Sequence, residues 1–275
     1  MKRFFALISV LCIALTAAAD NNNNTVVMKA VKCNSEFTKI AVGPAIKVFV
    51  EDRTEGNIII RATKSIIDDV KLEVSGDELS VSYNKDMHFN KKSDRNFAEV
   101  YIPNNGKLCD FTVAAAAIVE VKPKLSVKRL NIECIGASVI TLAAETESAE
   151  AEIVGASNAT LDIVCTKLNC ELMGAAKATI NGSATEAEFD ISGASTLKAA
   201  EFKASQLKAD IAGASKANLS ADMADIEVSG ASNAHIDCST LLKADAAGAS
   251  SIRYTGKCQV NIENNSGASK IKREE

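Results

Sequence analysis

Residues 155–195 read GASNATLDIVCTKLNCELMGAAKATINGSATEAEFDISGAS and contain consecutive copies of one pattern. A Gly-Ala-Ser or Gly-Ala-Ala tripeptide is flanked by alternating apolar residues, such as Leu168, Cys170 and Leu172. Alternation with a period of two is the period of a β-strand. The tripeptide recurs every 17 to 20 residues, starting at Gly136, Gly155, Gly174, Gly193, Gly213, Gly230, Gly248 and Gly267. The repeat therefore predicts a coil of β-strand per tripeptide, because helix-pair repeats are longer and need three- and four-residue apolar spacing.

A coil of this length cannot bury its apolar face alone, so the coils must stack in parallel and share one narrow core. This predicts an all-β fold, a single-stranded parallel β-helix or β-solenoid of about eight coils over residues 113–275. We expect the right-handed form, because the six-residue sub-repeat of left-handed β-helices is absent. The glycines expected to stack at one corner are Gly155, Gly174, Gly193 and Gly213. The residues expected in one inward column are Leu161, Ile180 and Leu219. Whether Ala or Ser of each tripeptide faces inward is left open.

The chain upstream of the repeats has a different character, which predicts an N-terminal all-β lobe or cap over residues 35–112. Strand-like segments occur at 46–50, 57–61, 70–74, 79–83 and 97–102. Turn signals separate several of them, and the polar run 84–96 is expected to form a loop. Residues 20–34 are expected to form a leader, whose polar part, Asn21 to Asn24, has no reason to order.

The first nineteen residues are typical of a secretory signal peptide. Lys2 and Arg3 precede an apolar run, and small residues follow before a cleavage position between Ala19 and Asp20. The apolar run is shorter than the ~20 residues of a membrane-spanning helix, so we expect no membrane span after cleavage. The mature protein is expected outside the cytoplasm, in the periplasm, at the cell surface or secreted.

The composition excludes several classes of function. The formal charge is −4 and only 24% of residues are charged, so the concentrated basic face of a nucleic-acid binder is not expected. Two histidines leave little material for imidazole-based metal sites or triads. Aromatic residues make up 4% and Trp is absent, which disfavours a sugar-stacking cleft, although Tyr254 and Phe202 keep that class open.

Seven cysteines follow the predicted signal peptide, and an odd number cannot pair completely. Cys134 and Cys170 occupy repeat positions that are apolar in other copies, which favours buried thiols over a disulfide framework. Cys33 and Cys109 form the pair that we would test first for a disulfide.

An acidic residue lies three positions before almost every tripeptide glycine. The series is Glu133, Glu152, Glu171, Asp190, Asp210, Glu227 and Asp245, followed by Asn264. Stacking should align these side chains as an outward ladder. One hypothesis is a calcium site at Glu152, Glu171, Asp190 and Asp210, because Ca²⁺ takes several carboxylate oxygens. The alternative, which we favour, is a solvated acidic stripe with no cofactor, since neighbours ~5 Å apart repel by only about 0.8 kcal/mol in water.

A lyase-like enzyme acting on polysaccharides is the catalytic alternative on such a scaffold. It would need acids, a basic residue and long substrate loops, whereas the repeats are uniform. The basic residues Lys198, Arg253 and Lys272 share an expected outward column with Thr141, Thr160, Thr179 and His235. A polar outer column is the simpler interpretation, so no catalytic residue is assigned.

The N-terminal stretch FTKIAVGPAIKVFVEDRTEGNIIIRATKSIIDDVKLEVSGDELSVSY at 37–83, then AEVYIP at 98–103 and the serial GAS coils, resemble a known family. The family comprises exported bacterial proteins named for an auto-transporter adhesin head, the GIN domain. The resemblance covers roughly residues 35–270, implies a β-helical exported protein with a role in adhesion, and supplies no catalytic motif.

The sequence thus predicts an exported, non-enzymatic β-solenoid that presents a repetitive surface to a glycan or protein partner at the cell envelope. Oligomerisation is left open. The rival hypotheses are the polysaccharide-active enzyme and a purely structural envelope protein.

Overall fold

The computed structural model describes residues 25–33, 36–53, 56–84 and 97–274, which form nineteen β-strands and no helix. The strands are β1 Val26–Lys32, β2 Lys39–Val42, β3 Lys47–Glu51, β4 Asn57–Thr63, β5 Val70–Ser75, β6 Glu78–Tyr83, β7 Ala98–Pro103, β8 Asp110–Ala114, β9 Ile118–Val121, β10 Leu125–Gly136, β11 Val139–Gly155, β12 Asn158–Gly174, β13 Lys177–Ile191, β14 Thr196–Ile211, β15 Lys216–Val228, β16 Asn233–Ala246, β17 Ser251–Thr255, β18 Gln259–Asn265 and β19 Lys270–Arg273. The strands predicted between residues 46 and 102 correspond to β3 to β7. The predicted signal peptide with its Ala19–Asp20 cleavage position, the first residues of the leader and most of the polar loop lie outside the described residues. The described part of the leader needs a correction, because Val26–Lys32 is strand β1 and pairs antiparallel with β4.

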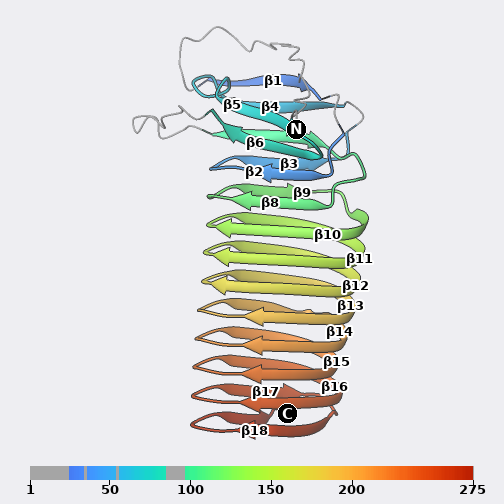
Figure 1. Ribbon diagram of the computed structural model, residues 1–275, viewed down its shortest axis with the longest axis vertical. Helices are drawn as coiled ribbons and strands as arrows, with labels where there is room; N and C mark the ends of the chain where they lie inside the picture. The colour runs from blue at the N-terminus through green and yellow to red at the C-terminus, as the bar shows by residue number, and fades with distance from the viewer. Residues whose placement is uncertain (1–24, 34–35, 54–55, 85–96, 275) are drawn as a thin grey trace, which may run out of the picture.

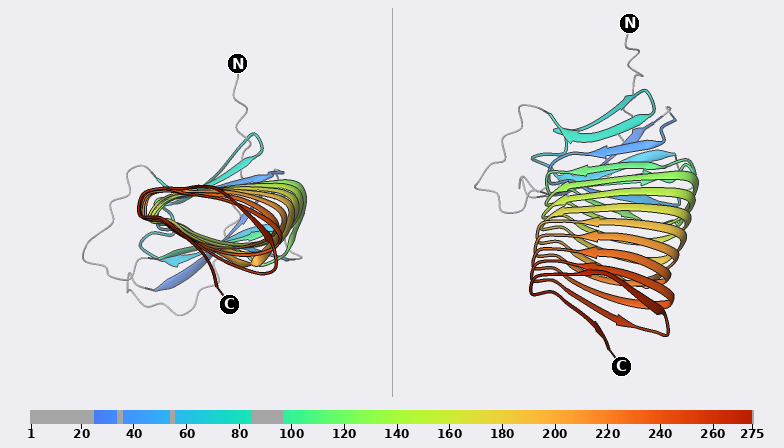
Figure 2. Two further views of the ribbon diagram at one scale, coloured as in Figure 1. Left: turned by 90° about the horizontal axis from the view of Figure 1, so that it is seen from below. Right: turned by 60° about the horizontal axis from the view of Figure 1, so that its bottom comes forward.

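The strands from β10 onward stack in parallel in the order of the sequence (Figure 1). Each long strand runs along one side of a coil, turns a corner and returns along the other side. Viewed along the stack, the coils superimpose as one flattened ring (Figure 2). The predicted β-solenoid is therefore confirmed, with two broad faces joined by two corners.

The glycine tripeptides form one corner, and their backbone groups bond from coil to coil. The Ala N–H donates to the Gly carbonyl of the preceding coil at 2.7 to 2.8 Å in all seven successive pairs from Ala156 to Ala268. The predicted stacking of the glycines is thus confirmed. The Ser residues answer the question that the sequence left open: all except the half-buried Ser269 are buried and point inward, as at Ser157, whose hydroxyl donates to the Val154 carbonyl at 2.8 Å. The alanines face outward.

The core is a series of inward columns of small and medium side chains. Leu161 lies beside Ile180 in the next coil, and Ala199 and Leu219 continue the buried series, as predicted for the three larger residues. Two phenylalanines fit because small residues lie beside them in the same column. Phe202 lies opposite Gly182, and its ring packs edge to face on Phe189 with centroids 6.1 Å apart.

The N-terminal region does not stack in the order of the sequence. The coil of β2 and β3 lies between the β6 and β7 coil and the β8 and β9 coil, and all four pairings are parallel. Antiparallel strands β1, β4 and β5 complete this end of the molecule (Figure 1). The predicted cap therefore exists as the antiparallel strands, while the parallel stack itself continues without a break across the boundary expected at residue 112.

Three of the seven described cysteines are core residues. Cys134, Cys170 and Cys238 are buried, as the thiol interpretation requires. Cys109 is a free thiol in the described part of the chain, so the disulfide with Cys33 that we would test first is absent.

Within the described ranges, the chain has no helix long and apolar enough to cross a membrane.

Candidate functional site

The acidic ladder predicted from the sequence exists and runs along one broad face. Glu133, Glu152, Glu171, Asp190 and Asp210 are in-register neighbours in β10 to β14, and Glu227 and Asp245 continue the series. At the end of the ladder, the Asn264 side-chain amide donates to the Asp245 carboxylate at 3.2 Å. The strand period explains the ladder, since every member lies on the outward side of its strand next to buried neighbours.

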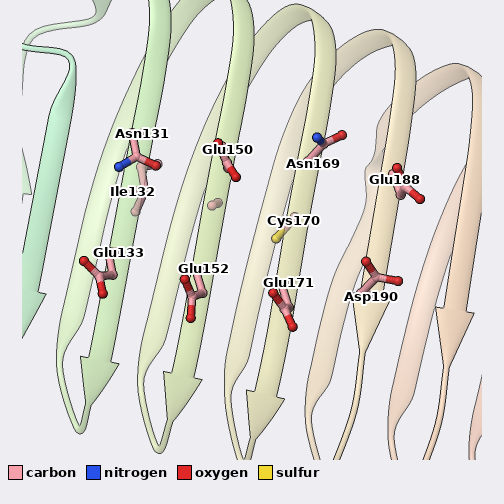
Figure 3. A pocket seen from close by; sticks show the side chains of 11 residues that line it. Asn131, Ile132, Glu133, Glu150, Glu152, Asn169, Cys170, Glu171, Glu188 and Asp190 are labelled. Atoms are coloured by element: carbon pink, nitrogen blue, oxygen red, sulfur yellow. The ribbon is translucent and has the colours of Figure 1, made fainter.

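A second outward column lies two residues before the ladder and is a feature that sequence reasoning missed. Asn131, Glu150, Asn169 and Glu188 are aligned in register beside it. The two columns line a groove of about 460 Å³ that crosses four coils (Figure 3). The sequence does contain a signal for this second column, because residues i and i−2 lie on the same face of a strand.

The groove holds six carboxylates, and no Lys or Arg is among its described lining residues. Burial, and then the neighbouring Asp210 and Glu188 carboxylates, raise the pKa of Asp190. Two lysines lie just beyond the groove: Lys208 is 3.4 Å from Glu188 and 3.6 Å from Asp210, and Lys167 lies two residues before Asn169 on the outward side of β12. The groove is therefore a region of excess negative charge, in which Lys208 at one end pairs with Glu188.

Asn169 supplies the groove with an unusual polar atom. Its side-chain oxygen is buried and has no hydrogen-bond partner among the described residues. In contrast, the Asn131 side-chain amide donates to Asp110 at 3.1 Å. Acceptor oxygens thus dominate this surface, so a ligand rich in N–H or O–H donors would fit it.

The described Asp, Glu, His and Cys residues do not gather three potential ligands around one point that could hold a metal ion. Glu152, Glu171, Asp190 and Asp210 lie along the stack, one per coil, rather than around a common centre. The calcium hypothesis therefore stays a prediction, and the geometry offers it no ligand cluster.

One sulfur atom lies close to these acids but is unsuited to chemistry. Cys170 contributes to the groove lining and is 3% exposed. Burial, with a contribution from Glu171 and Asp190, raises the pKa of this thiol to about 12. Because the thiolate is the nucleophilic form, Cys170 is inert at neutral pH.

The opposite broad face carries the polar column predicted from the sequence. Its in-register residues are Thr141, Thr160, Thr179, Lys198, Asn218, His235, Arg253 and Lys272. Glu274 pairs with His235 and with Arg253, both at 3.3 Å. The two faces of the solenoid therefore differ in charge, with acids on one and mostly hydroxyl and basic groups on the other.

The aromatic residues considered for sugar stacking need a correction. Phe202 is 1% exposed and belongs to the core, because the adjacent glycine leaves room for its ring. The stacked aromatic pair on the surface is instead Phe49 and Tyr101, with centroids 5.1 Å apart, at the top of the polar column. The strand pattern signals this pair, since both residues alternate with buried valines and isoleucines.

A family model described as "Putative auto-transporter adhesin, head GIN domain" matches residues 36–223. The chain belongs to the head GIN domain family. The head GIN domain protein is also similar to solved structures. A putative adhesin from Parabacteroides distasonis is 17% identical, with a TM-score of 0.72 over 91% of this chain and 98% of that one. A putative adhesin from Parabacteroides merdae is 18% identical, with a TM-score of 0.69 over 92% and 98%.

A third similar structure, from P. distasonis, bears the description "putative lipid binding protein". It is 15% identical to this head GIN domain protein, with a TM-score of 0.67 over 92% of this chain and 98% of that one. At these identities the likeness establishes the shared fold. No curated protein matches the chain.

Proposed function

We propose that this head GIN domain protein is a non-enzymatic adhesin of the cell envelope, and that the acidic groove binds a cationic, donor-rich segment of a partner. The observation that carries the proposal is the groove itself, with six carboxylates and no cation in its described lining. Family membership supports the adhesion role. The predicted signal peptide supports a location outside the cytoplasm.

Electrostatics gives the reason for a cationic partner. Like charges in adjacent coils repel, and at Asp190 burial and the neighbouring carboxylates raise the pKa, so its charged form is disfavoured. A Lys or Arg side chain from a partner would relieve both costs with charge-assisted hydrogen bonds. The unpartnered oxygen of Asn169 would accept a further hydrogen bond from the same segment.

The regular stack suits an extended partner. Neighbouring coils present equivalent groups ~4.8 Å apart, so a partner that lies along the stack would meet successive carboxylates rather than a single point. Several weak contacts made together raise the overall avidity without any strong single site. This is the behaviour required of an adhesin that holds a surface through repeated contacts.

Non-enzymatic binding fits the groove better than catalysis does. Its described lining consists of carboxylates, amides, two apolar side chains and the inert Cys170 thiol. A lyase would need a base able to remove a proton from an acidic sugar, and such a substrate would be repelled by the six carboxylates.

The test is binding of a fluorescent oligolysine peptide to the full chain, measured by anisotropy at several salt concentrations. The groove variant Glu152→Gln with Glu171→Gln should bind about tenfold more weakly, since each lost carboxylate removes a contact of roughly 0.5 to 1 kcal/mol. The control variant Glu147→Gln with Glu201→Gln removes the same charge from exposed positions outside the groove. Equal affinity of the two variants would refute the groove as the binding site.

A second arm of the test addresses catalysis. The protein is incubated with acidic polysaccharides, and new unsaturated or reducing ends are measured. We expect none above background. Turnover that survives purification and is lost in the groove variant would overturn the non-enzymatic proposal.

A further inference from the structure

Two cysteines of consecutive coils occupy the same corner, opposite the glycine tripeptides. Asp237 pairs with Thr255 before this corner, and Leu241 pairs with Gln259 after it. Between these pairs each coil has three residues, 238–240 in one and 256–258 in the next. Cys238 and Cys258 therefore lie in stacked corner segments although twenty positions separate them in the chain.

The corner is packed closely enough to bring the two thiols together. Gly256 has φ +89°, and a Cβ there would lie 2.1 Å from the Cys238 carbonyl oxygen, so only glycine permits this approach. The Cys258 side chain lies close enough to Cys238 to raise the pKa of the Cys238 thiol. Cys238 is buried, whereas Cys258 is half-buried and packs against the core.

The coil that contains Cys258 is the least protected one. Six of the seven residues of strand β18 are exposed, and Ile262 is 51% exposed. In the described chain, β18 pairs with β16 on one side only. Terminal repeats of a solenoid are the first to open because they have a neighbour on one side.

We propose that Cys238 and Cys258 are a site of thiol oxidation whose disulfide staples the last coil to the one before it. The oxidant is a disulfide RSSR, either a small one such as oxidised glutathione or an exported thiol–disulfide oxidoreductase. The half-buried Cys258, as thiolate, attacks RSSR, forms a mixed disulfide and releases one RS⁻. Cys238 then attacks the Cys258 sulfur and releases the second RS⁻. Two protein thiols are oxidised to one disulfide, and RSSR is reduced to two RSH.

The order of attack follows from exposure. Cys258 is the thiol that an external disulfide can reach, and the buried Cys238 acts second, from within the corner. Burial, followed by the neighbouring Cys258, raises the pKa of Cys238 to about 11. The second step is therefore expected to accelerate as the pH rises, because it needs the Cys238 thiolate.

Cys165 provides a matched control in the same corner column. The in-register series runs through Thr146, Cys165, Ala184, Ala204, Ala221 and Cys238. Cys165 is also half-buried, but its neighbours in the adjacent coils are Thr146 and Ala184. It can form a mixed disulfide, and no thiol in either adjacent coil of its column is present to resolve it.

The experiment treats the reduced full chain with oxidised glutathione, quenches with acid, alkylates the remaining thiols and maps peptides by mass spectrometry. We expect a peptide pair linked through Cys238 and Cys258, formed faster at pH 9 than at pH 7, and no protein disulfide at Cys165. Cys258→Ser should abolish the link. A stable glutathione adduct on Cys258 with an alkylated Cys238 would overturn the proposal.

Hydrogen exchange tests the staple itself. Oxidation should slow amide exchange in residues 251–265 by about tenfold or more, while exchange in β11 and β12 stays unchanged. Cys258→Ser should show the exchange of the reduced protein under both conditions. A linked peptide without slower exchange in the last coil would refute the stapling role.

Discussion

Replacing Gly193 with Ala should separate two costs that the tripeptide corner imposes on any side chain. The first cost is a positive φ, which is +78° at Gly193. The second is the approach of the preceding coil, because a Cβ at Gly193 would lie 2.4 Å from the Gly174 carbonyl oxygen. That oxygen accepts the hydrogen bond from Ala194 at 2.7 Å, so it cannot move aside without lengthening the corner ladder.

Gly136 provides the matched control because it begins the same tripeptide with φ +87°. Its hypothetical Cβ has ordinary contacts, the nearest atom being the Ala115 nitrogen at 3.5 Å. Ala115 and Ala116 themselves have φ 56° and 65°, which shows that Ala tolerates this corner where the neighbouring coil leaves room.

The expected magnitudes follow from these contacts. A left-handed conformation costs an L-residue roughly 1 to 2 kcal/mol, and the lower entropy of the unfolded Ala chain offsets about 0.4 to 1 kcal/mol of that. Gly136→Ala should therefore lose about 1 kcal/mol. Gly193→Ala adds an overpacking cost of about 1 to 3 kcal/mol, so its total should be roughly 3 kcal/mol.

The measurement is urea unfolding of both variants and the parent, followed by circular dichroism, with hydrogen exchange to show which coils open. Exchange is needed because solenoids do not always unfold in one cooperative step. In Gly193→Ala the faster-exchanging amides should centre on β12 to β14. If the two variants lose the same free energy within about 0.5 kcal/mol, the coil-to-coil contact is not what requires glycine.

Four further outcomes are expected. Leu161→Ala should cost about 2 to 5 kcal/mol in urea unfolding as a core truncation, whereas Lys198→Ala should cost less than about 0.5 kcal/mol; equal losses would mean that the faces are misassigned. Ser157→Ala should cost about 1 kcal/mol through its hydrogen bond to Val154, whereas Ser195→Ala should be neutral or stabilising, because the buried Ser195 hydroxyl has no partner among the described residues; this too is read from urea midpoints. Because the pKa of Asp190 is raised in the folded protein, its charge destabilises the fold at neutral pH, and Asp190→Asn should raise the melting temperature there. This advantage should be lost as the pH falls through the raised pKa to the ordinary value of 3.8. Sodium and calcium chloride at equal ionic strength should raise the melting temperature alike by screening the acidic ladder; a saturable increase specific to calcium would instead establish chelation.

The repeats can be predicted from the sequence because one physical constraint recurs in every coil. A tripeptide glycine, a buried serine and alternating apolar residues each report the same local geometry, so the spacing of the tripeptides alone places Gly174 and Gly193 at one corner. The acidic ladder follows directly, since a fixed offset from the glycine fixes a position in the coil.

The N-terminal coils cannot be predicted in this way. The β2 and β3 coil inserts between strands that follow it in the chain, and strand periodicity carries no information on such an order. The corner glycine is also replaced there, by Ala45 and by Ala115 and Ala116 at positive φ, so the repeat signal disappears while the geometry continues. The sequence leaves Phe202 open to a surface role because its coil is longer than both neighbouring coils. The additional residues shift the alternation by which an inward or outward side chain would be judged.

The difference in charge between the two broad faces bears on where specificity can reside. Inward residues are limited by the neighbouring coil's volume, and the tripeptide corner by its hydrogen-bond ladder, so neither position can vary freely. Outward residues carry no such limit, and stacking turns each choice into a continuous column. A face that alternated acids with lysines would satisfy its own charges, as Lys208 does with Glu188 and Asp210. Glu188 at the edge of the groove has such a partner, but no Lys or Arg is among the described residues that line the groove, and folding alone gives no reason to concentrate six carboxylates there, since they repel one another. A ligand that supplies the missing positive charge does give one.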